Sequence, residues 1–132
     1  MRKIPKKMQD KSELEVARLI ARAALDKKAE DVVILDVRGL CSFADYFVIM
    51  SGRSTRHVQG LASAVDEALG HKRIKQSSIE GLNDGLWVLI DYIGVVVHVF
   101  YKETREFYQL ERLWHDAPQV EPADAVQSDG AS

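Results

Sequence analysis

The sequence has little cysteine, no metal-binding spacing and no long hydrophobic run. Cys41 is the single cysteine of the 132 residues, so the chain cannot form an intramolecular disulfide, and nothing indicates an oxidising compartment. The four histidines form no HxxxH or HxH pair, and no CxxC is present, so we expect neither a metal nor another cofactor. No apolar run has the length of a transmembrane helix or follows the N-terminus as in a signal peptide. The expected location is therefore cytoplasmic.

The chain also has no large net charge, because its acids and bases nearly balance and leave a formal net charge of −2. Residues 1–11 hold five bases and one acid, giving +4, whereas residues 116–132 hold four acids and no base, giving −4. A domain that binds nucleic acid by neutralising phosphates is normally strongly basic. We therefore predict no DNA binding, and a contact between the basic N-terminus and RNA remains an open alternative to a solvated arm.

The chain is organised around residues 86–101, LWVLIDYIGVVVHVFY. Two apolar runs rich in β-branched and aromatic residues flank Ile93-Gly94. This pattern predicts an antiparallel hairpin in the middle of a sheet, with Gly94 supplying a positive φ at the turn. The few polar residues of the hairpin, Asp91, Tyr92 and His98, need partners inside the fold or on another molecule.

Capping signals and apolar runs define the other elements. Three helices are predicted: residues 12–28 behind the capping box of Ser12 and Glu15, a second from the N-cap Ser54 to Gly70 at C′, and a third from Thr104. Strands are predicted over 31–37 and 45–50, with a weak edge strand at 71–78 and a loop at 80–85. The order α-β-β-α-β-β-β-α indicates a single α/β domain with a mixed sheet of about five strands and packed helices.

The length is that of one domain, and changes in composition mark its boundaries. We predict a basic N-terminal arm at 1–11, a folded domain at 12–115 and a disordered acidic tail at 116–132, where Pro, Ala, Asp, Gln and Ser dominate. Removal of the residues after Asp116 is expected to leave the melting temperature unchanged.

Several features could carry chemistry, and each has an ordinary structural explanation. The turn at 51–54 before the second helix could hold an anion, although it contains neither GxxxxGK[ST] nor GxGxxG. Acids such as Asp84 and Asp91 could bind a metal, but no D-x-D pair occupies one strand. His98 has three alternative roles: a partly buried histidine with a partner inside the fold, a residue of an interaction surface, or a catalytic base. Trp87 has two, a core residue or an interface anchor. From these residues alone, a partner-binding domain and a nucleotidyltransferase-like enzyme are alternative hypotheses.

Four segments match a known family in order and spacing: residues 36–58, 80–92, 95–100 and 105–114. The closest matches are the G-x-S-x-R-H-V run from Gly52 to Val58, Glu80-Gly81, Trp87, Asp91, the V-V-H-V run ending in Val99, and the group Arg105, Tyr108, Leu110, Glu111, Leu113 and Trp114. Over residues 12–115 the chain resembles the ribosomal silencing factor family, also called the Iojap-like family.

The resemblance implies a nucleotidyltransferase-like superfold without enzyme activity. It implies binding to the large ribosomal subunit through the fourteenth large-subunit ribosomal protein, which blocks subunit joining and represses translation under nutrient limitation. An assembly factor for the large subunit and an enzyme are the alternatives, and some family members form homodimers. The implied partner surface consists of Trp87, Asp91, Tyr92 and His98, with Glu80 and Asp84 as further acidic contributors.

One departure concerns the hairpin turn, where the family usually has D-Y-G-D. This chain has Asp91-Tyr92-Ile93-Gly94, so one acid is missing and the glycine is displaced by one position. If that acid meets a basic residue of the ribosomal protein, the contact is lost here, with a small effect because rim charges mainly tune association rates.

Overall fold

The computed structural model describes the backbone of residues 6–122 and the side chains of residues 13–122. The elements in chain order are α1 (Lys6–Asp26), β1 (Glu30–Asp36), β2 (Tyr46–Gly52), α2 (Thr55–His71), β3 (Ser78–Glu80), β4 (Trp87–Asp91), β5 (Val95–Tyr101), α3 (Lys102–Tyr108), α4 (Leu110–Leu113) and β6 (Gln119–Val120). The expected α/β class and element order are confirmed, and α4 and β6 are additional.

The strands form one mixed sheet of six strands in the order β3-β4-β5-β2-β1-β6. The only parallel pair among these strands is β2 with β5, where Val48 lies opposite Val97. The chain leaves β2 through α2, β3 and β4 before it returns in β5, which is the long crossover that parallel neighbours require. The two central strands are buried for nearly their whole length, as their continuous apolar sequences predict.

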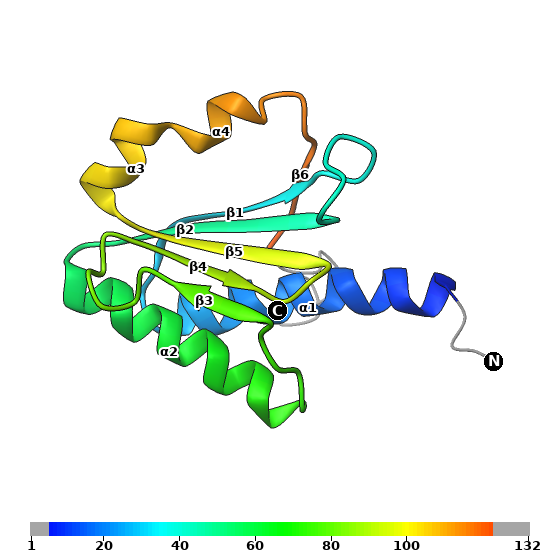
Figure 1. Ribbon diagram of the computed structural model, residues 1–132, viewed down its shortest axis with the longest axis horizontal. Coiled ribbons are helices and arrows are strands. Elements are labelled where there is room, and N and C mark those ends of the chain that lie inside the picture. Colours follow the sequence, from blue (N-terminus) through cyan, green and yellow to red (C-terminus); the bar gives the residue numbers. More distant parts are fainter. Residues whose placement is uncertain (1–5, 123–132) are drawn as a thin grey trace, which may run out of the picture.

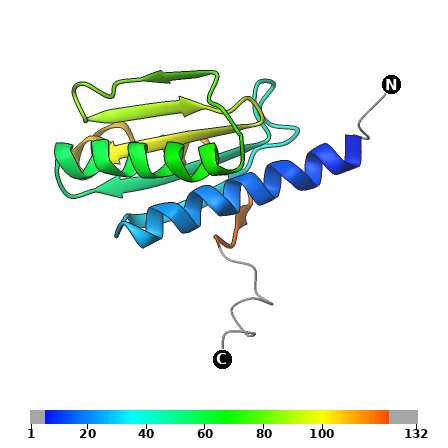
Figure 2. The same ribbon diagram turned by 90° about the horizontal axis from the view of Figure 1, so that it is seen from below.

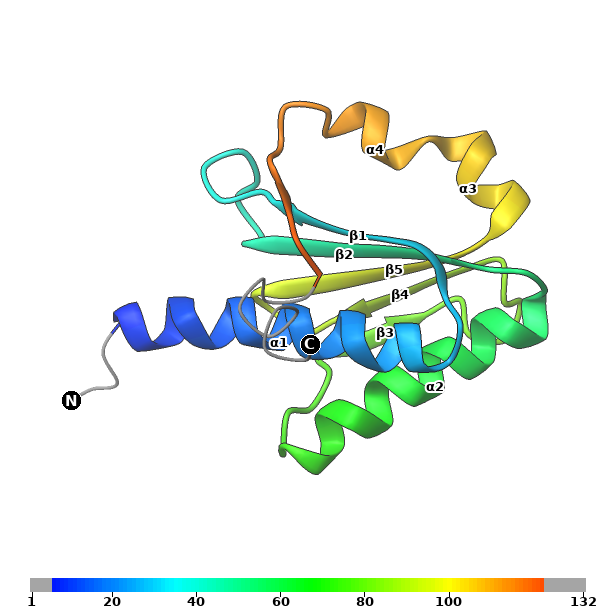
Figure 3. The same cartoon turned by 180° about the vertical axis from the view of Figure 1, so that it is seen from behind.

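The helices cover the two faces of the sheet unequally (Figure 1). Helices α1 and α2 lie side by side across one face, as the view from below shows (Figure 2). The short helices α3 and α4 lie over the opposite face (Figure 3). This face is therefore covered by much less helix than the other.

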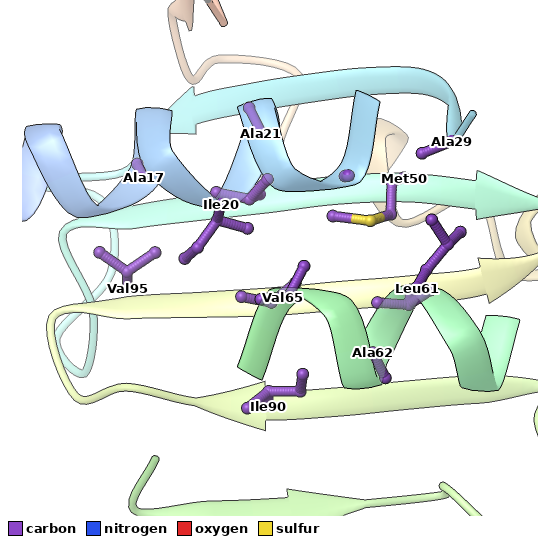
Figure 4. Packing of buried hydrophobic residues seen from close by; sticks show 14 of the residues in the cluster. Ala17, Ile20, Ala21, Ala29, Met50, Leu61, Ala62, Val65, Ile90 and Val95 are labelled. Atoms are coloured by element: carbon purple, nitrogen blue, oxygen red, sulfur yellow. The ribbon is translucent and has the colours of Figure 1, made fainter. Parts of the chain in front are cut away.

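The larger core lies between the sheet and the pair α1–α2. Ile20 of α1 and Leu61 and Val65 of α2 point at the sheet, where they meet Met50 and Ile90 (Figure 4). All five side chains are fully buried. Burying a side chain of this size stabilises the fold by about 1.5–3 kcal/mol, so this layer is the main source of stability.

The predicted start of the first helix at Ser12 is wrong, because α1 begins at Lys6 and continues through Ser12. Residues 6–11 contain neither glycine nor proline, and lysine, methionine and glutamine are good helix formers. Part of the predicted basic arm is thus helical, and residues 1–5 lie outside the described residues.

The predicted cap at Ser54 is confirmed, because its Oγ accepts a hydrogen bond from the His57 N–H at 3.0 Å. Two other predicted helix ends are wrong. Helix α2 continues through Gly70 to His71, and the left-handed residue that follows is Arg73 at φ 62°. Helix α3 begins at Lys102, so Thr104 lies inside it rather than capping it. A left-handed Gln109 (φ 49°) then separates α3 from α4.

The predicted tail is partly folded. Strand β6 pairs with β1, where Val120 lies opposite Ile34, and the Pro118 carbonyl accepts from the Asp36 N–H at 2.9 Å. Ala117 is buried in the core on the α3 side of the sheet. The boundary at Asp116 is therefore wrong for residues 117–120, because a two-residue strand leaves too short a pattern to detect. Residues 123–132 lie outside the described part of the chain.

The hairpin between β4 and β5 is confirmed, but its positive φ falls on Ile93 (φ 76°) and not on Gly94. The atoms nearest to an added Cβ at Gly94 belong to the Glu13 carboxylate of α1, the end of a flexible side chain, so close packing does not explain this glycine. The edge strand is likewise displaced, to Ser78–Glu80, because Ile79 aligns with Ile90 of β4. No helix in the described part of the chain is long and apolar enough to cross a membrane.

Candidate binding face of the sheet

The side chains of the candidate site are brought together by the register of β3, β4 and β5. Glu80 lies opposite Leu89, and Leu89 lies opposite His98, so these three side chains form one row across the sheet. Trp87 and Asp91 share this face because alternate residues of a strand point the same way. We call the side of the sheet that carries Glu80, Trp87, Leu89, Asp91 and His98 the Trp87 face.

Trp87 is the centre of an aromatic cluster. Its ring stacks on Phe100 with a centroid distance of 4.8 Å and an interplanar angle of 29°. The ring of Tyr108 on α3 lies tilted against Trp87, with the ring centroids 5.0 Å apart. The indole Nε1–H of Trp87 donates to Nδ1 of His98 at 3.2 Å. The ring is half-buried, so these contacts fix its orientation while leaving part of it available to a partner.

His98 is the most deeply buried of the predicted site residues, at 5% exposure. Burial lowers the pKa of His98 to about 4, so its imidazole is neutral at physiological pH. Its ring lies between Trp87 and Phe47, and the Phe47 ring meets it at 74° with centroids 5.2 Å apart. This aromatic setting, without a nucleophile at hydrogen-bond distance in the described part of the chain, does not suit a catalytic base.

Two of the predicted acids, Glu80 and Asp91, lie on strands at the edge of the Trp87 face. Asp91 ends β4 and accepts a hydrogen bond from the Ile93 N–H at 2.7 Å, which stabilises the turn. Glu80 and Asp84 are exposed, on β3 and in the loop that follows it. Gln59 of α2 holds that loop by donating to the Leu82 carbonyl at 2.8 Å. Glu80 and Asp91 thus supply negative charge at the edge of the Trp87 face, whereas Asp84 lies beyond that edge in the loop that α2 holds.

Tyr92 does not belong to the Trp87 face. It follows Val88 and Ile90 in the alternation and lies on the opposite side, among the residues buried under α1 and α2. It is 8% exposed, and its hydroxyl donates to Asp66 of α2 at 2.7 Å. Burial, with the adjacent carboxylate, raises its pKa well above the usual value for tyrosine. Tyr92 is a core residue that joins the sheet to α2.

Several apolar residues of α3 and α4 are exposed, which the sequence analysis did not predict. Phe107 and Leu113 are 80% and 74% exposed, and Tyr108 is 54% exposed. Two hollows of about 410 and 490 Å³ flank the contact between Trp87 and Tyr108. A signal for this existed, since apolar residues at 107, 108, 110, 113 and 114 surround more of a helix than one buried stripe requires.

The possible anion site at residues 51–54 is filled by the protein's own groups. The Arg53 N–H donates to His57 Nδ1 at 3.0 Å, and the His57 N–H donates to Ser54 Oγ. A Cβ atom on Gly52 would lie only 2.9 Å from the Val58 side chain, which accounts for the glycine by packing alone. The turn is therefore a helix cap closed by His57.

A hollow of about 830 Å³ is lined in part by Arg105, and this arginine is bonded within the protein. Its guanidinium donates to Ser51 Oγ and the Asp31 carbonyl, both at 2.8 Å, and forms an ion pair with Glu111. Among residues 13–122, no group of three His, Cys, Asp or Glu side chains could hold a metal. Among the described residues, the feature that stands out is a partly covered apolar face, which is typical of proteins that act by binding a partner.

Comparison with known proteins agrees with this class and gives the family. The family model described as "Ribosomal silencing factor during starvation" matches residues 9–132. The chain belongs to the ribosomal silencing factor (RsfS, or Iojap) family, whose members bind the large ribosomal subunit and are not enzymes. The resemblance seen in the sequence is thereby confirmed.

Individual relatives show how far the similarity extends. The ribosomal silencing factor RsfS of Bacillus subtilis (strain 168) is 43% identical over 111 residues, covering 84% of this chain and 92% of the relative. The chloroplastic protein Iojap of Zea mays is 31% identical over 82% of this chain and 47% of its own length. A crystal structure of a Chromobacterium violaceum protein superposes with a TM-score of 0.76 at 34% identity, covering 77% of this chain and 85% of that one. A crystal structure of a Bacillus halodurans protein superposes with a TM-score of 0.73 at 41% identity, covering 82% of this chain and 98% of that one.

Proposed function

We propose that this protein silences translation by binding the fourteenth protein of the large ribosomal subunit with its Trp87 face, so that the small subunit cannot join. The proposed place of action is the cytoplasm, and the proposed condition is nutrient limitation. The observation that carries the proposal is the half-buried Trp87, held within an aromatic cluster and flanked by exposed apolar residues of α3. Exposed apolar patches of this kind mark protein interaction sites.

The chemistry of the face fits a basic ribosomal protein. Trp87 and Tyr108 are residue types that commonly anchor interfaces, and Glu80 and Asp91 supply negative charge at the rim, with Asp84 in the loop beyond it. Such charges speed association with a positive partner more than they strengthen the final complex. A stable complex requires roughly 800 Å² of buried surface on each partner, and a steric block requires no catalytic group.

The proposal assigns unequal roles to the predicted site residues. Trp87 is the anchor, with Tyr108 beside it, and Glu80 and Asp91 form the rim, with Asp84 in the loop beyond it. His98 lies behind Trp87 and supports it. Tyr92 is left out because its ring is buried on the other side of the sheet.

Cosedimentation with purified large subunits, followed by addition of small subunits, tests the proposal. Trp87→Ala should weaken binding by more than about 1 kcal/mol and restore subunit joining, since truncating a central aromatic anchor has effects of this size. Leu25→Ala is the matched control, because Leu25 is exposed to 49% on α1, away from the Trp87 face. Equal binding of wild type and the Trp87 variant would contradict the proposed site, and no binding by the wild type would contradict the function.

A role in assembly of the large subunit is the second candidate. It is favoured by a Mus musculus relative named "Mitochondrial assembly of ribosomal large subunit protein 1", 34% identical over 91 residues, although these cover only 40% of that protein. Under this alternative, cells without the protein accumulate precursor subunits during growth. Under the silencing proposal, they instead lose fitness mainly during starvation, and sucrose-gradient profiles distinguish the two.

A further inference from the structure

The polar atom of Trp87 points into the protein, whereas part of its ring faces outward. Nε1 donates to His98 Nδ1 at 3.2 Å, and His98 is almost completely buried. Two hollows have Trp87 in their lining together with mainly residues of α3 and α4. A partner that approaches this face therefore meets the apolar part of the indole and not its N–H group.

A histidine is an unusual residue at position 98. Its sequence neighbours on β5 are Val96, Val97 and Val99, and all three are buried. Placing a polar ring in such a strand is unfavourable unless a hydrogen bond compensates. The hydrogen bond recorded for the imidazole within the described residues is the one that Trp87 donates. The polar side chain at position 98 therefore acts as the hydrogen-bond acceptor for Trp87.

The protonation state suits this arrangement. Because the imidazole is neutral at physiological pH, one ring nitrogen accepts while the other carries the proton. Acceptance at Nδ1 requires the proton to be on Nε2. The acceptor offered to Trp87 is therefore present throughout the physiological pH range.

We propose that His98 is a positioning residue of the interface: it accepts the indole N–H of Trp87, so that the anchor presents only apolar ring surface and needs no acceptor from its partner. This inference rests on the proposed function of the Trp87 face. It also specifies the partner chemistry, because aliphatic groups or the cations of lysine and arginine suit an exposed indole ring. A basic protein surface supplies both.

The energetic reason lies in what happens when the partner covers Trp87. Without His98, the indole N–H would have to bond to water and would lose that water when the partner covers the ring, and an unsatisfied buried donor is unfavourable. His98 satisfies this donor before binding. It also holds the ring against Phe100 and Tyr108, so less side-chain freedom is lost when the complex forms.

The test compares His98→Leu with His98→Asn. These side chains have nearly the same shape, but only asparagine can place an acceptor near the position of Nδ1. We expect the leucine variant to bind large subunits roughly tenfold more weakly, as expected for a donor left unsatisfied, and the asparagine variant to recover most of the affinity. Equal affinity of the two variants would overturn the proposal. Loss of binding in Trp87→Ala with wild-type binding in His98→Leu would overturn this inference alone and leave the proposed function intact.

A measurement on the unaltered ring covers the case in which both His98 variants fail to fold. In a Trp114→Phe background, Trp87 has the single indole N–H resonance. We expect that proton to be protected from exchange with solvent, and the imidazole nitrogens of His98 to report the Nε2–H form from pH 5 to 8. Rapid exchange of the indole proton, or titration of His98 in this range, would show that the hydrogen bond does not hold Trp87.

Discussion

Arg105 offers the sharpest test of how the Trp87 face is built, because one guanidinium connects three parts of the fold. It donates to the Asp31 carbonyl at the start of β1 and to the Ser51 hydroxyl at the end of β2. It also forms an ion pair with Glu111 of α4 at 2.5 Å. Replacing it with methionine keeps a similar apolar stem and removes all of these bonds.

The expected loss of stability follows from burial. Removing one partner of a fully buried ion pair typically costs about 3–5 kcal/mol, because the remaining charge stays in the interior. Here the Arg105 side chain is 10% exposed but that of Glu111 is 36% exposed, so the stranded carboxylate can regain water. We therefore expect Arg105→Met to lose about 2–3 kcal/mol. For a domain of this size, that loss lowers the melting temperature by roughly 6–15 °C.

The assay is urea denaturation of wild type, Arg105→Met and the control Arg112→Met at several pH values. Arg112 is exposed and donates to Gln109 at 2.8 Å, so its loss should cost less than about 0.5 kcal/mol. Equal effects of the two substitutions would refute the reasoning.

The pH dependence gives a second check. Burial would raise the pKa of Glu111, but the hydrogen bond and charge of Arg105 outweigh it and hold the pKa below its usual value. A carboxyl whose pKa is lowered in the folded state stabilises the protein above its unfolded pKa, and this contribution disappears as pH falls through the folded pKa. The difference in free energy of unfolding between wild type and Arg105→Met should therefore have its full value at neutral pH and become smaller below about pH 4.

Three further predictions concern other parts of the fold. Ending the chain after Asp116 should lower the stability by about 1–3 kcal/mol through loss of β6 and the buried residue before it, whereas ending it after Pro122 should leave the melting temperature unchanged. Ile93→Gly should raise the stability by about 0.5–1 kcal/mol in denaturant titrations, because a β-branched residue is strained at φ 76° and its side chain is 70% exposed; a decrease would show that the turn is not strained. Tyr92→Phe should lose about 1 kcal/mol with the hydrogen bond to Asp66 and still cosediment normally with large subunits, and weakened cosedimentation would return Tyr92 to the interface.

The sequence was most informative where a periodic pattern was long. The apolar runs of the hairpin and of β2 were long enough to predict a central sheet, and Ser54 marked the start of α2 correctly. The short elements were not predictable in the same way. Two residues of β6 and one left-handed Gln109 leave almost no local signal, because distant contacts decide their conformation.

The candidate site shows a different limit. Strand alternation alone places Tyr92 with Val88 and Ile90, away from Trp87, so this assignment was available from the sequence. Motif resemblance grouped Tyr92 with its neighbours in sequence and not with its neighbours in space. The contribution of Tyr108 depends on the angle at which α3 leaves β5, and no local pattern specifies that angle.

The place of β6 at the edge of the sheet has a consequence for synthesis of the protein. The residues of the Trp87 face that lie on strands come from β3, β4 and β5. At the other edge of the sheet, β6 pairs with Ile34 and Leu35 of β1 and is made later than every other element described. While the chain is being made, the outer backbone of β1 stays unpaired until residues 119–120 emerge. An open strand edge of this kind can pair with other chains. Until then, a nascent copy can form a nearly complete binding surface while its sheet still has an open edge.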